Sequence, residues 1–171
     1  MINDILFALW IFLPNGISNI MAVVAAKLPY LRDWNTPLDM GKSVGGVRIF
    51  GDHKTVRGLV FGVLCGTVFG LIQKVLVGGN YDALIVSVGV SFGAIAGDAI
   101  KSFFKRRVGI ASGETWVPFD QIDYVLGGLV MLHLIYPLSV WQYLAIFLVY
   151  GFFHPVFTWI GYLLKLKKSP L

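Results

Sequence analysis

Five long apolar runs constrain the fold of this chain more than any other feature. They lie near residues 4–28, 58–77, 83–103, 122–138 and 140–164. Each is close to the roughly 20 helical residues that cross about 30 Å of hydrocarbon. Because 57% of the 171 residues are hydrophobic, an ordinary soluble domain is excluded. We therefore predict an all-α integral membrane protein, a bundle of five transmembrane helices that forms a single domain over residues 1–171.

Basic residues are distributed unevenly between the segments that join these runs. The long loop 29–57 and the loop 104–121 are basic, whereas the turns at 78–82 and 137–141 carry no Lys or Arg. The tail is basic too, with Lys165, Lys167 and Lys168. By the positive-inside rule we expect both long loops and the C-terminus in the cytoplasm and the N-terminus outside. The protein would then be a multi-pass protein of the cell membrane with its charged groups on the cytoplasmic side.

Polar residues on the third run give the strongest functional signal. At its end, four of them follow the spacing i, i+3, i+4 and i+7, namely Asp98, Lys101, Ser102 and Lys105. This spacing places them on one helical face, which Ser87, Ser91 and Ala94 continue deeper into the membrane. Charged groups are costly so close to hydrocarbon and are usually functional there. We therefore expect this face to line a charged cavity open to the cytoplasm.

Two further carboxylates, Asp120 and Asp123, open the fourth run. Together with Asp98 they form a cluster of acidic residues near the edge of the membrane. Mg²⁺ prefers carboxylate and phosphate oxygens, so these three residues are candidate metal ligands. For Asp120 and Asp123 alone, a role at the N-terminus of a helix is the alternative.

The first long loop combines basic residues, glycines and interleaved apolar side chains, which argues against disorder. Gly-Lys-Ser at 41–43 lacks the earlier glycine and the preceding strand of a Walker loop, which excludes that site. The glycines admit a close ligand, and cationic side chains donate to phosphate oxygens. The candidates for that contact are Lys42, Arg48, Lys54 and Arg57. A solvated basic loop is the alternative.

Small and polar residues inside the runs indicate how the helices meet. Glycines recur every four residues, at 58, 62, 66 and 70 and at 89, 93 and 97, which favours close helix packing. Pro14, followed by Asn15 and Asn19, predicts a bend or local unwinding with the amides turned inward. Hydrogen bonding between helices and lining of a ligand cavity both remain open for these amides. His53 is another candidate for cavity lining or a plain loop donor.

Two paired motifs carry a family resemblance. The first is P-x-D-x-G-K at 37–42 with G-x-R-x-F-G-D-x-K-T-x-R-G at 46–58. The second combines Gly97-Asp98, Lys101-Ser102, Lys105-Arg106, Pro118 and Asp120-Gln-Ile-Asp123. Over essentially the whole chain this pattern resembles the archaeal CDP-archaeol synthases, relatives of the CDP-diacylglycerol synthases. The bacterial and eukaryotic relatives carry a His-Gly-Gly that this chain lacks, which favours the archaeal branch.

The resemblance implies an Mg²⁺-assisted transfer of CMP from CTP to 2,3-bis-O-(geranylgeranyl)-sn-glycerol 1-phosphate, giving CDP-archaeol and pyrophosphate. The expected partners are CTP and this isoprenoid ether lipid phosphate, with no nucleic acid; the oligomeric state stays open. The catalytic residues would be Asp98, Lys101, Asp120 and Asp123, with the three aspartates as metal ligands. The phosphate-binding residues would be Lys42, Arg48, Lys54, Thr55, Arg57, Ser102, Lys105 and Arg106.

Three other functions are compatible with parts of the sequence. A CTP-dependent polyprenol or dolichol kinase would use similar groups but release CDP. A small ion channel or transporter would need polar residues across the whole membrane, whereas the charges here stop at one side. A lipid-binding subunit without catalysis would not need so many cationic groups.

Overall fold

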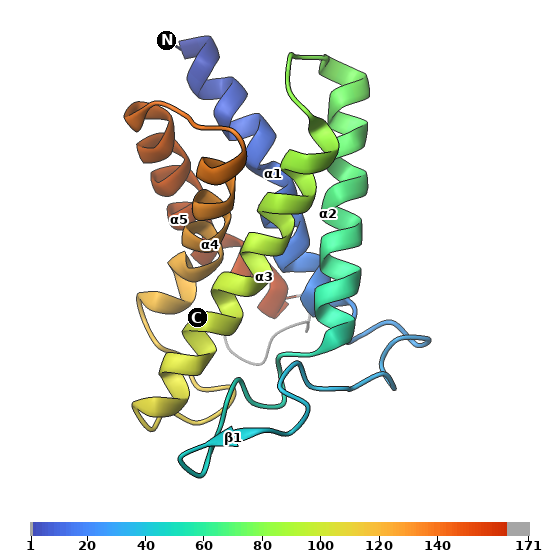
Figure 1. Ribbon diagram of the computed structural model, residues 1–171, viewed down its shortest axis with the longest axis vertical. Coiled ribbons are helices and arrows are strands. Elements are labelled where there is room, and N and C mark those ends of the chain that lie inside the picture. Colours follow the sequence, from blue (N-terminus) through green and yellow to red (C-terminus); the bar gives the residue numbers. More distant parts are fainter. Residues whose placement is uncertain (1, 164–171) are drawn as a thin grey trace.

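The computed structural model describes residues 2–163 and confirms the all-α architecture (Figure 1). Its helices are α1 (Ile2–Val24), α2 (Val56–Val77), α3 (Ala83–Arg107), α4 (Phe119–Ile135) and α5 (Val140–Leu163). The first long loop also contains a small hairpin of β1 (Ser43–Val44) and β2 (Val47–Arg48), which the sequence did not predict. α3 continues to Arg107, four residues past the predicted end of the third run, so Lys105 and Arg106 lie on a helix and not in a loop. The lysines of the tail lie outside the described residues.

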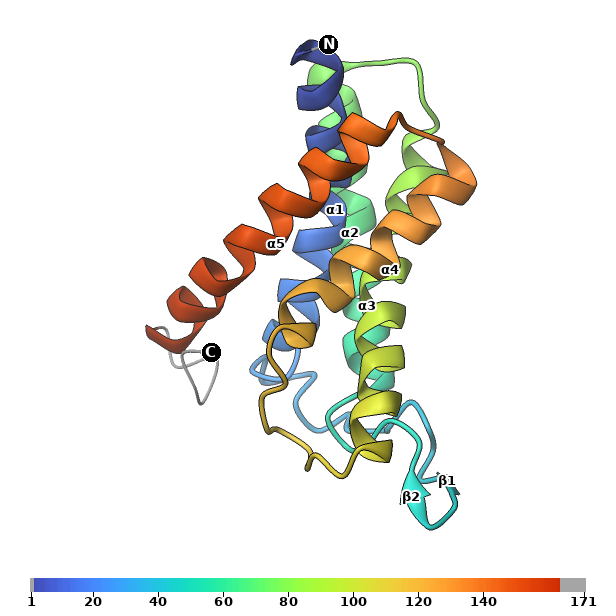
Figure 2. The same ribbon diagram turned by 90° about the vertical axis from the view of Figure 1, so that its left-hand side faces the viewer.

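Among the described residues, three helices, α1, α2 and α3, are long and apolar enough to cross a membrane. α4 has 17 residues, which corresponds to about 25 Å at 1.5 Å per residue. The apolar part of α5 found among the described residues is Val140–Phe152. Figure 2 shows α5 leaning away from the other helices toward its C-terminal end.

The two long connections, residues 25–55 and 108–118, lie at the same end of the bundle, which we call the loop end (Figures 1 and 2). The N-terminus and the turns after α2 and α4 lie at the opposite end. α1 contacts each of the other four helices, and α3 packs against α1, α2 and α4, so these two helices form the centre of the bundle. The predicted grouping of the two basic loops at one end is therefore confirmed.

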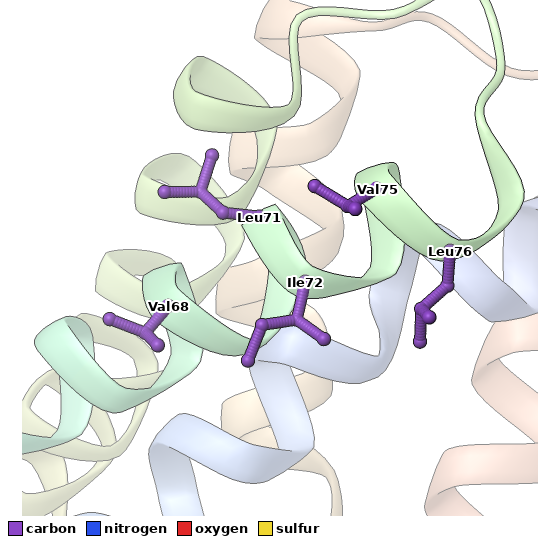
Figure 3. A pocket seen from close by; sticks show the side chains of 5 residues that line it. All are labelled: Val68, Leu71, Ile72, Val75 and Leu76. Atoms are coloured by element: carbon purple, nitrogen blue, oxygen red, sulfur yellow. The ribbon is translucent and has the colours of Figure 1, made fainter.

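The core of the bundle is an apolar cluster to which four helices contribute. Phe12 of α1, Val90 of α3, Val125 of α4 and Ile146 of α5 are each completely buried in it. Tyr150 packs edge-on against Phe12, with ring centroids 5.0 Å apart. The apolar side chains that remain exposed face outward, as expected for helices in lipid. Five of them, Val68, Leu71, Ile72, Val75 and Leu76, line a hollow on the outer face of α2 (Figure 3).

The glycine stripes lie where the helices are closest, as predicted. A Cβ added at Gly62 or Gly66 of α2 would lie only 2.8 Å from the Ser18 carbonyl oxygen or 2.7 Å from that of Pro14, both in α1. A Cβ at Gly93 of α3 would lie 2.5 Å from the Gly127 carbonyl oxygen of α4. These backbones approach each other at distances that no larger residue permits.

The helix continues through Pro14 without interruption, so the local unwinding that the sequence allowed there is not found, and a bend at this residue stays a prediction. A proline removes a helical hydrogen bond, here the one to the carbonyl oxygen of Trp10. Gln73 of α2 donates to that oxygen instead, at 2.8 Å. Asn15 is completely buried, and its amide donates to the carbonyl oxygens of Val90 and Tyr124, each at 3.0 Å. Hydrogen bonding between helices therefore stabilises this segment.

The deeper part of the Asp98 face is packed and does not line a cavity, which corrects the expectation for it. Ser87, Ser91 and Ala94 are buried. The Ser91 hydroxyl donates to the Pro14 carbonyl oxygen at 3.3 Å. Small residues on α2 let α3 approach so closely that its serines fill the space. Asn19 is partly buried, and its predicted place in a cavity stays a prediction.

Candidate active site

A cluster of ion pairs lies at the loop end, where three segments meet. The end of α3 contributes Asp98, Lys101 and Lys105; the start of α4 contributes Asp120 and Asp123; the loop before α2 contributes Lys54. The contact between α3 and α4 at Gly97 and Gly127 holds these segments together, because a Cβ at Gly97 would collide with the backbone of Asp123. Close packing of the helices therefore positions the charged groups.

Lys101 lies at the centre of this cluster. Its ammonium nitrogen is 3.1 Å from Asp98 Oδ1, 2.5 Å from Asp120 Oδ1 and 2.6 Å from Asp123 Oδ2. The Lys101 side chain is only 13% exposed. All three predicted metal ligands thus converge on one point, and a lysine ammonium occupies that point.

Two further lysines each pair with one carboxylate of the cluster. Lys54 pairs with Asp98 Oδ2. Lys105 lies 3.2 Å from Asp120 Oδ2 and also donates to the Glu114 carbonyl oxygen. Unpaired charges are very costly in such partly buried surroundings, so mutual pairing is what allows the cluster to exist there.

Asp39 organises the first long loop, a role that the sequence analysis missed although Asp39 belongs to the P-x-D-x-G-K motif. Its carboxylate accepts from Arg48 Nη2 at 2.6 Å and from the backbone N–H groups of Phe50, Gly51 and Gly41 at 2.9, 3.1 and 3.1 Å. Burial alone would raise the pKa of Asp39, but these hydrogen bonds hold its pKa well below the ordinary value. The carboxylate therefore folds the glycine-rich segment around itself.

Two arginines attach the loop to the helices. Arg107 of α3 donates to the carbonyl oxygens of Arg48 and Ile49, at 2.9 and 3.1 Å. At the start of α2, Arg57 donates to loop oxygens at 2.8–3.0 Å, namely the carbonyl oxygens of Leu31 and Arg32 and Oδ1 of Asn35. The loop is consequently fixed against the ends of the same helices that carry the cluster.

The structure brings together six of the predicted site residues, and the others lie around them. Arg48 pairs with Asp39 and with Asp52, the latter at 2.7 Å. Thr55 accepts from Gly58 N–H at 3.1 Å and caps α2. The remaining predicted residues are Ser102, which is buried, Arg106, which is partly buried, and Lys42 and His53, which are exposed. In this arrangement Arg48, Thr55 and Arg57 hold the loop in place, and their contact with phosphate stays a prediction.

The donor chemistry of the cluster fits a divalent cation, although its geometry is closed around Lys101. Three carboxylates supply the hard oxygen ligands that Mg²⁺ prefers. Asp123 Oδ2 is buried and accepts no hydrogen bond of good geometry. Within residues 2–163, however, no three His, Cys, Asp or Glu side chains are arranged to hold a metal ion as they stand. Binding would require Lys101 to move.

Membrane-embedded helices, clustered carboxylates and lysines, and a basic glycine-rich loop together define a class, the intramembrane enzymes that act on phosphate groups. Comparison with known proteins agrees with this class. A solved structure described as an intramembrane enzyme for archaeal membrane lipids biosynthesis matches with a TM-score of 0.78 and 32% identity, over 90% of this chain and 93% of the other. This likeness confirms the membrane bundle.

The family model that matches residues 1–171 is described as CarS-like CDP-archaeol synthase. Similar curated proteins include the CDP-archaeol synthases of Methanocaldococcus jannaschii, 36% identical over 98% of both chains, and Pyrobaculum aerophilum, 35% identical over 92% of this chain and 93% of the relative. The chain belongs to the CDP-archaeol synthase family. It is a CTP-dependent cytidylyltransferase of archaeal lipid synthesis, as its motifs predicted.

Proposed function

We propose that the ion-pair cluster is the place where the phosphate of 2,3-bis-O-(geranylgeranyl)-sn-glycerol 1-phosphate attacks CTP. The observation that carries this proposal is the convergence of Asp98, Asp120 and Asp123 on one point, with lysines on either side, where a helix bundle meets a basic loop. A lipid phosphate held in the bilayer and a water-soluble nucleotide meet most directly at such an edge.

The reaction needs no nucleophile from the protein. An oxygen of the lipid phosphate forms a bond to the α-phosphorus of CTP, and the bond from that phosphorus to the bridging oxygen of the β-phosphate breaks. Pyrophosphate leaves with the electron pair, and CDP-archaeol remains. The enzyme therefore has to align two phosphates and stabilise the developing negative charge. Lys54, Lys101 and Lys105 lie where they would do both.

Mg²⁺ is the divalent cation we propose, held by Asp98, Asp120 and Asp123. When bound, it supplies Lewis-acid stabilisation of phosphate oxygens without proton transfer. The carboxylates come from two helices whose backbones are in contact, so their relative position is fixed before substrate binds.

The first long loop, which lies at the loop end of the bundle, is proposed to cover the triphosphate. Asp39 shapes its glycine-rich segment, and Lys42 and His53 are exposed on it and accessible to a ligand. Arg106, on the adjacent face of α3, is another candidate for a phosphate contact. Backbone N–H groups and cations in such a loop favour phosphate oxygens.

The site is proposed to face the cytoplasm, which supplies CTP. In a Cys65→Ser background, we expect cysteines introduced at Asn80 and at Ser112 to react from opposite sides of intact cells. Both positions are exposed, and they belong to the turn after α2 and to the connection 108–118, which lie at opposite ends of the bundle (Figure 1). The Ser112 cysteine should be protected from an impermeant reagent. Equal access to both cysteines would contradict the topology.

Labelling CTP at one phosphorus atom shows which part of the nucleotide is transferred, so it tests the reaction directly. Purified protein is incubated with Mg²⁺, the lipid phosphate and CTP labelled at either the α- or the γ-phosphorus. We expect the α-label in the lipid product and the γ-label in pyrophosphate, with neither transferred when the lipid phosphate is omitted. A γ-label in the lipid, with the α-label in CDP, would instead identify a kinase.

A further inference from the structure

The ammonium of Lys101 occupies the point toward which all three carboxylates are directed. Its distances of 3.1, 2.5 and 2.6 Å to Asp98, Asp120 and Asp123 are those of a cation shared between three anions. Mg²⁺ lies about 2.0–2.1 Å from its oxygen ligands. The three carboxylates are thus arranged around a cation whose place a smaller divalent ion could take after a modest inward shift.

We propose that Lys101 is an exchangeable cation: its ammonium holds the three carboxylates together without metal, and a divalent cation binds by displacing it. This inference rests on the proposed function only in taking Asp98, Asp120 and Asp123 as the ligands. Without such a counter-ion, three like charges at this separation would repel each other and push α3 and α4 apart.

Lys101 differs from the other two lysines in its contacts. Lys54 pairs with one carboxylate, Asp98, and Lys105 pairs with one, Asp120. Lys101 alone among the described residues bridges all three. Its four-carbon stem is flexible and its ammonium has no fixed planar geometry, so the group can leave without disturbing the helix. The planar donor groups of an arginine at this position would bind the carboxylates in a fixed geometry, so an arginine would leave less readily.

The exchange also changes the charge of the site. The three carboxylates and three ammonium groups of the cluster have formal charges that cancel. A divalent ion that displaces Lys101 without expelling it from the cluster raises the net charge by two. A neutral, closed cluster then becomes a cationic one with a free ammonium group beside it. Such a site attracts a triphosphate and a lipid phosphate.

Binding of Mn²⁺ alone, measured by electron paramagnetic resonance on purified protein, tests the exchange without relying on turnover. We expect Lys101→Met to bind Mn²⁺ about tenfold or more tightly than the unsubstituted protein, a change of about 1.4 kcal/mol. Lys105→Met is the matched control, because it removes the same charge from the same cluster without vacating the central point. The increase in Mn²⁺ affinity should be distinctly smaller for Lys105→Met than for Lys101→Met. Equal gains, or no gain in Lys101→Met, would overturn the exchange.

Asp98→Asn separates failure of this inference from failure of the proposed metal site. If Mn²⁺ binds and Asp98→Asn does not weaken it, the metal lies elsewhere and both proposals fail. If Asp98→Asn weakens binding and Lys101→Met leaves it unchanged, the ligands are right and only the exchange is wrong.

Lysine labelling on the unsubstituted protein provides a measurement that does not depend on a variant folding. An amine-acetylating reagent is applied with and without Mn²⁺, and the modified lysines are quantified by mass spectrometry. We expect Mn²⁺ to raise labelling of Lys101 severalfold, because the displaced amine is no longer held by carboxylates. The exposed Lys27 should not change. Unchanged or reduced labelling of Lys101 would contradict displacement.

Discussion

The two halves of α3 perform different tasks with the same backbone. From Ala83 to Gly97 the helix packs through glycines and serines against α1, α2 and α4. From Asp98 to Arg107 it carries the charged residues that pair across to α4 and to the first long loop. The small-residue half determines how closely the helices pack. This close packing brings the charged half within ion-pair distance of α4. Residues that pack the bundle and residues that carry charge thus lie in different parts of the same helix.

The first test of this division removes single carboxylates from the charged half and from the start of α4, with which it pairs. Asp98→Asn, Asp120→Asn and Asp123→Asn each keep the shape of the side chain and lose the charge that we propose holds the metal. We expect the folded proteins to lose CMP transfer by about 100-fold or more, the scale of a lost electrostatic contact to the transition state. Asp82→Asn is the control. It removes the same charge at the other end of α3, where Asn also accepts the capping hydrogen bond from Ile85 N–H. Near-normal turnover in all three variants would contradict the assignment.

Overpacking the small-residue half should instead damage stability. In Gly97→Ala the added methyl group meets the backbone of Asp123, which cannot yield locally. We expect the free energy of unfolding to fall by about 1–3 kcal/mol, measured by unfolding in detergent, with activity lost because Asp123 moves. Gly151→Ala in α5 should be tolerated, since its new Cβ would lie 3.8 Å from Ile122. If Gly97→Ala were as stable as the parent, close backbone packing would not be what positions the cluster.

A smaller effect is expected for Lys54, a lysine of the first long loop that pairs with the charged half. Lys54→Ala leaves the carboxylates and Lys101 in place but removes a cation that pairs with Asp98. Turnover at saturating CTP and lipid should fall about tenfold, equivalent to about 1.4 kcal/mol. Lys27→Ala removes an exposed charge near the same end and should leave the rate unchanged. Identical rates for both variants would make Lys54 a plain surface charge.

The smallest effect concerns the loop that lies against the charged half. Asp39→Asn should lower the free energy of unfolding at pH 7 by about 1 kcal/mol, because an amide cannot accept all the hydrogen bonds of the carboxylate. The pKa of Asp39 is depressed in the folded protein, so its contribution is complete above the unfolded pKa of about 3.9 and is lost as pH falls through the folded pKa. The difference between parent and variant should therefore narrow below about pH 4. The exposed Asp33→Asn is the control, and a difference that does not depend on pH would contradict this role.

Both halves of α3 were predictable from sequence only in part, since the glycine stripe was expected to pack but Ser87 and Ser91 were expected to line a cavity and are packed instead. Glycine repeats and apolar runs are local patterns, so the spans and the packing face follow from them. Helical spacing also placed Asp98, Lys101 and Lys105 on one face. Which lysine lies between the carboxylates depends on how α3 meets α4, which no spacing specifies. The same holds for Asp39, whose hydrogen bonds come from residues up to 12 positions away.

Pro14 and Arg57 show that a contact from another segment can be added to what a sequence signal indicates. The proline predicts disruption, but Gln73 from a neighbouring helix supplies the missing partner for Trp10. Arg57 has the chemistry of a phosphate ligand, yet loop carbonyl oxygens use its Nη1 donor group in this arrangement. Both residues thus have contacts with another segment that the sequence did not indicate, and the phosphate contact of Arg57 stays a prediction.

Anomalous X-ray diffraction from crystals grown with Mn²⁺ and a non-hydrolysable CTP analogue tests the central claim most directly. We expect a manganese peak enclosed by the carboxylates of Asp98, Asp120 and Asp123, the analogue's α-phosphate beside it, and the Lys101 ammonium displaced from its central position. A peak away from these three residues, or a triphosphate bound at another part of the molecule, would contradict it.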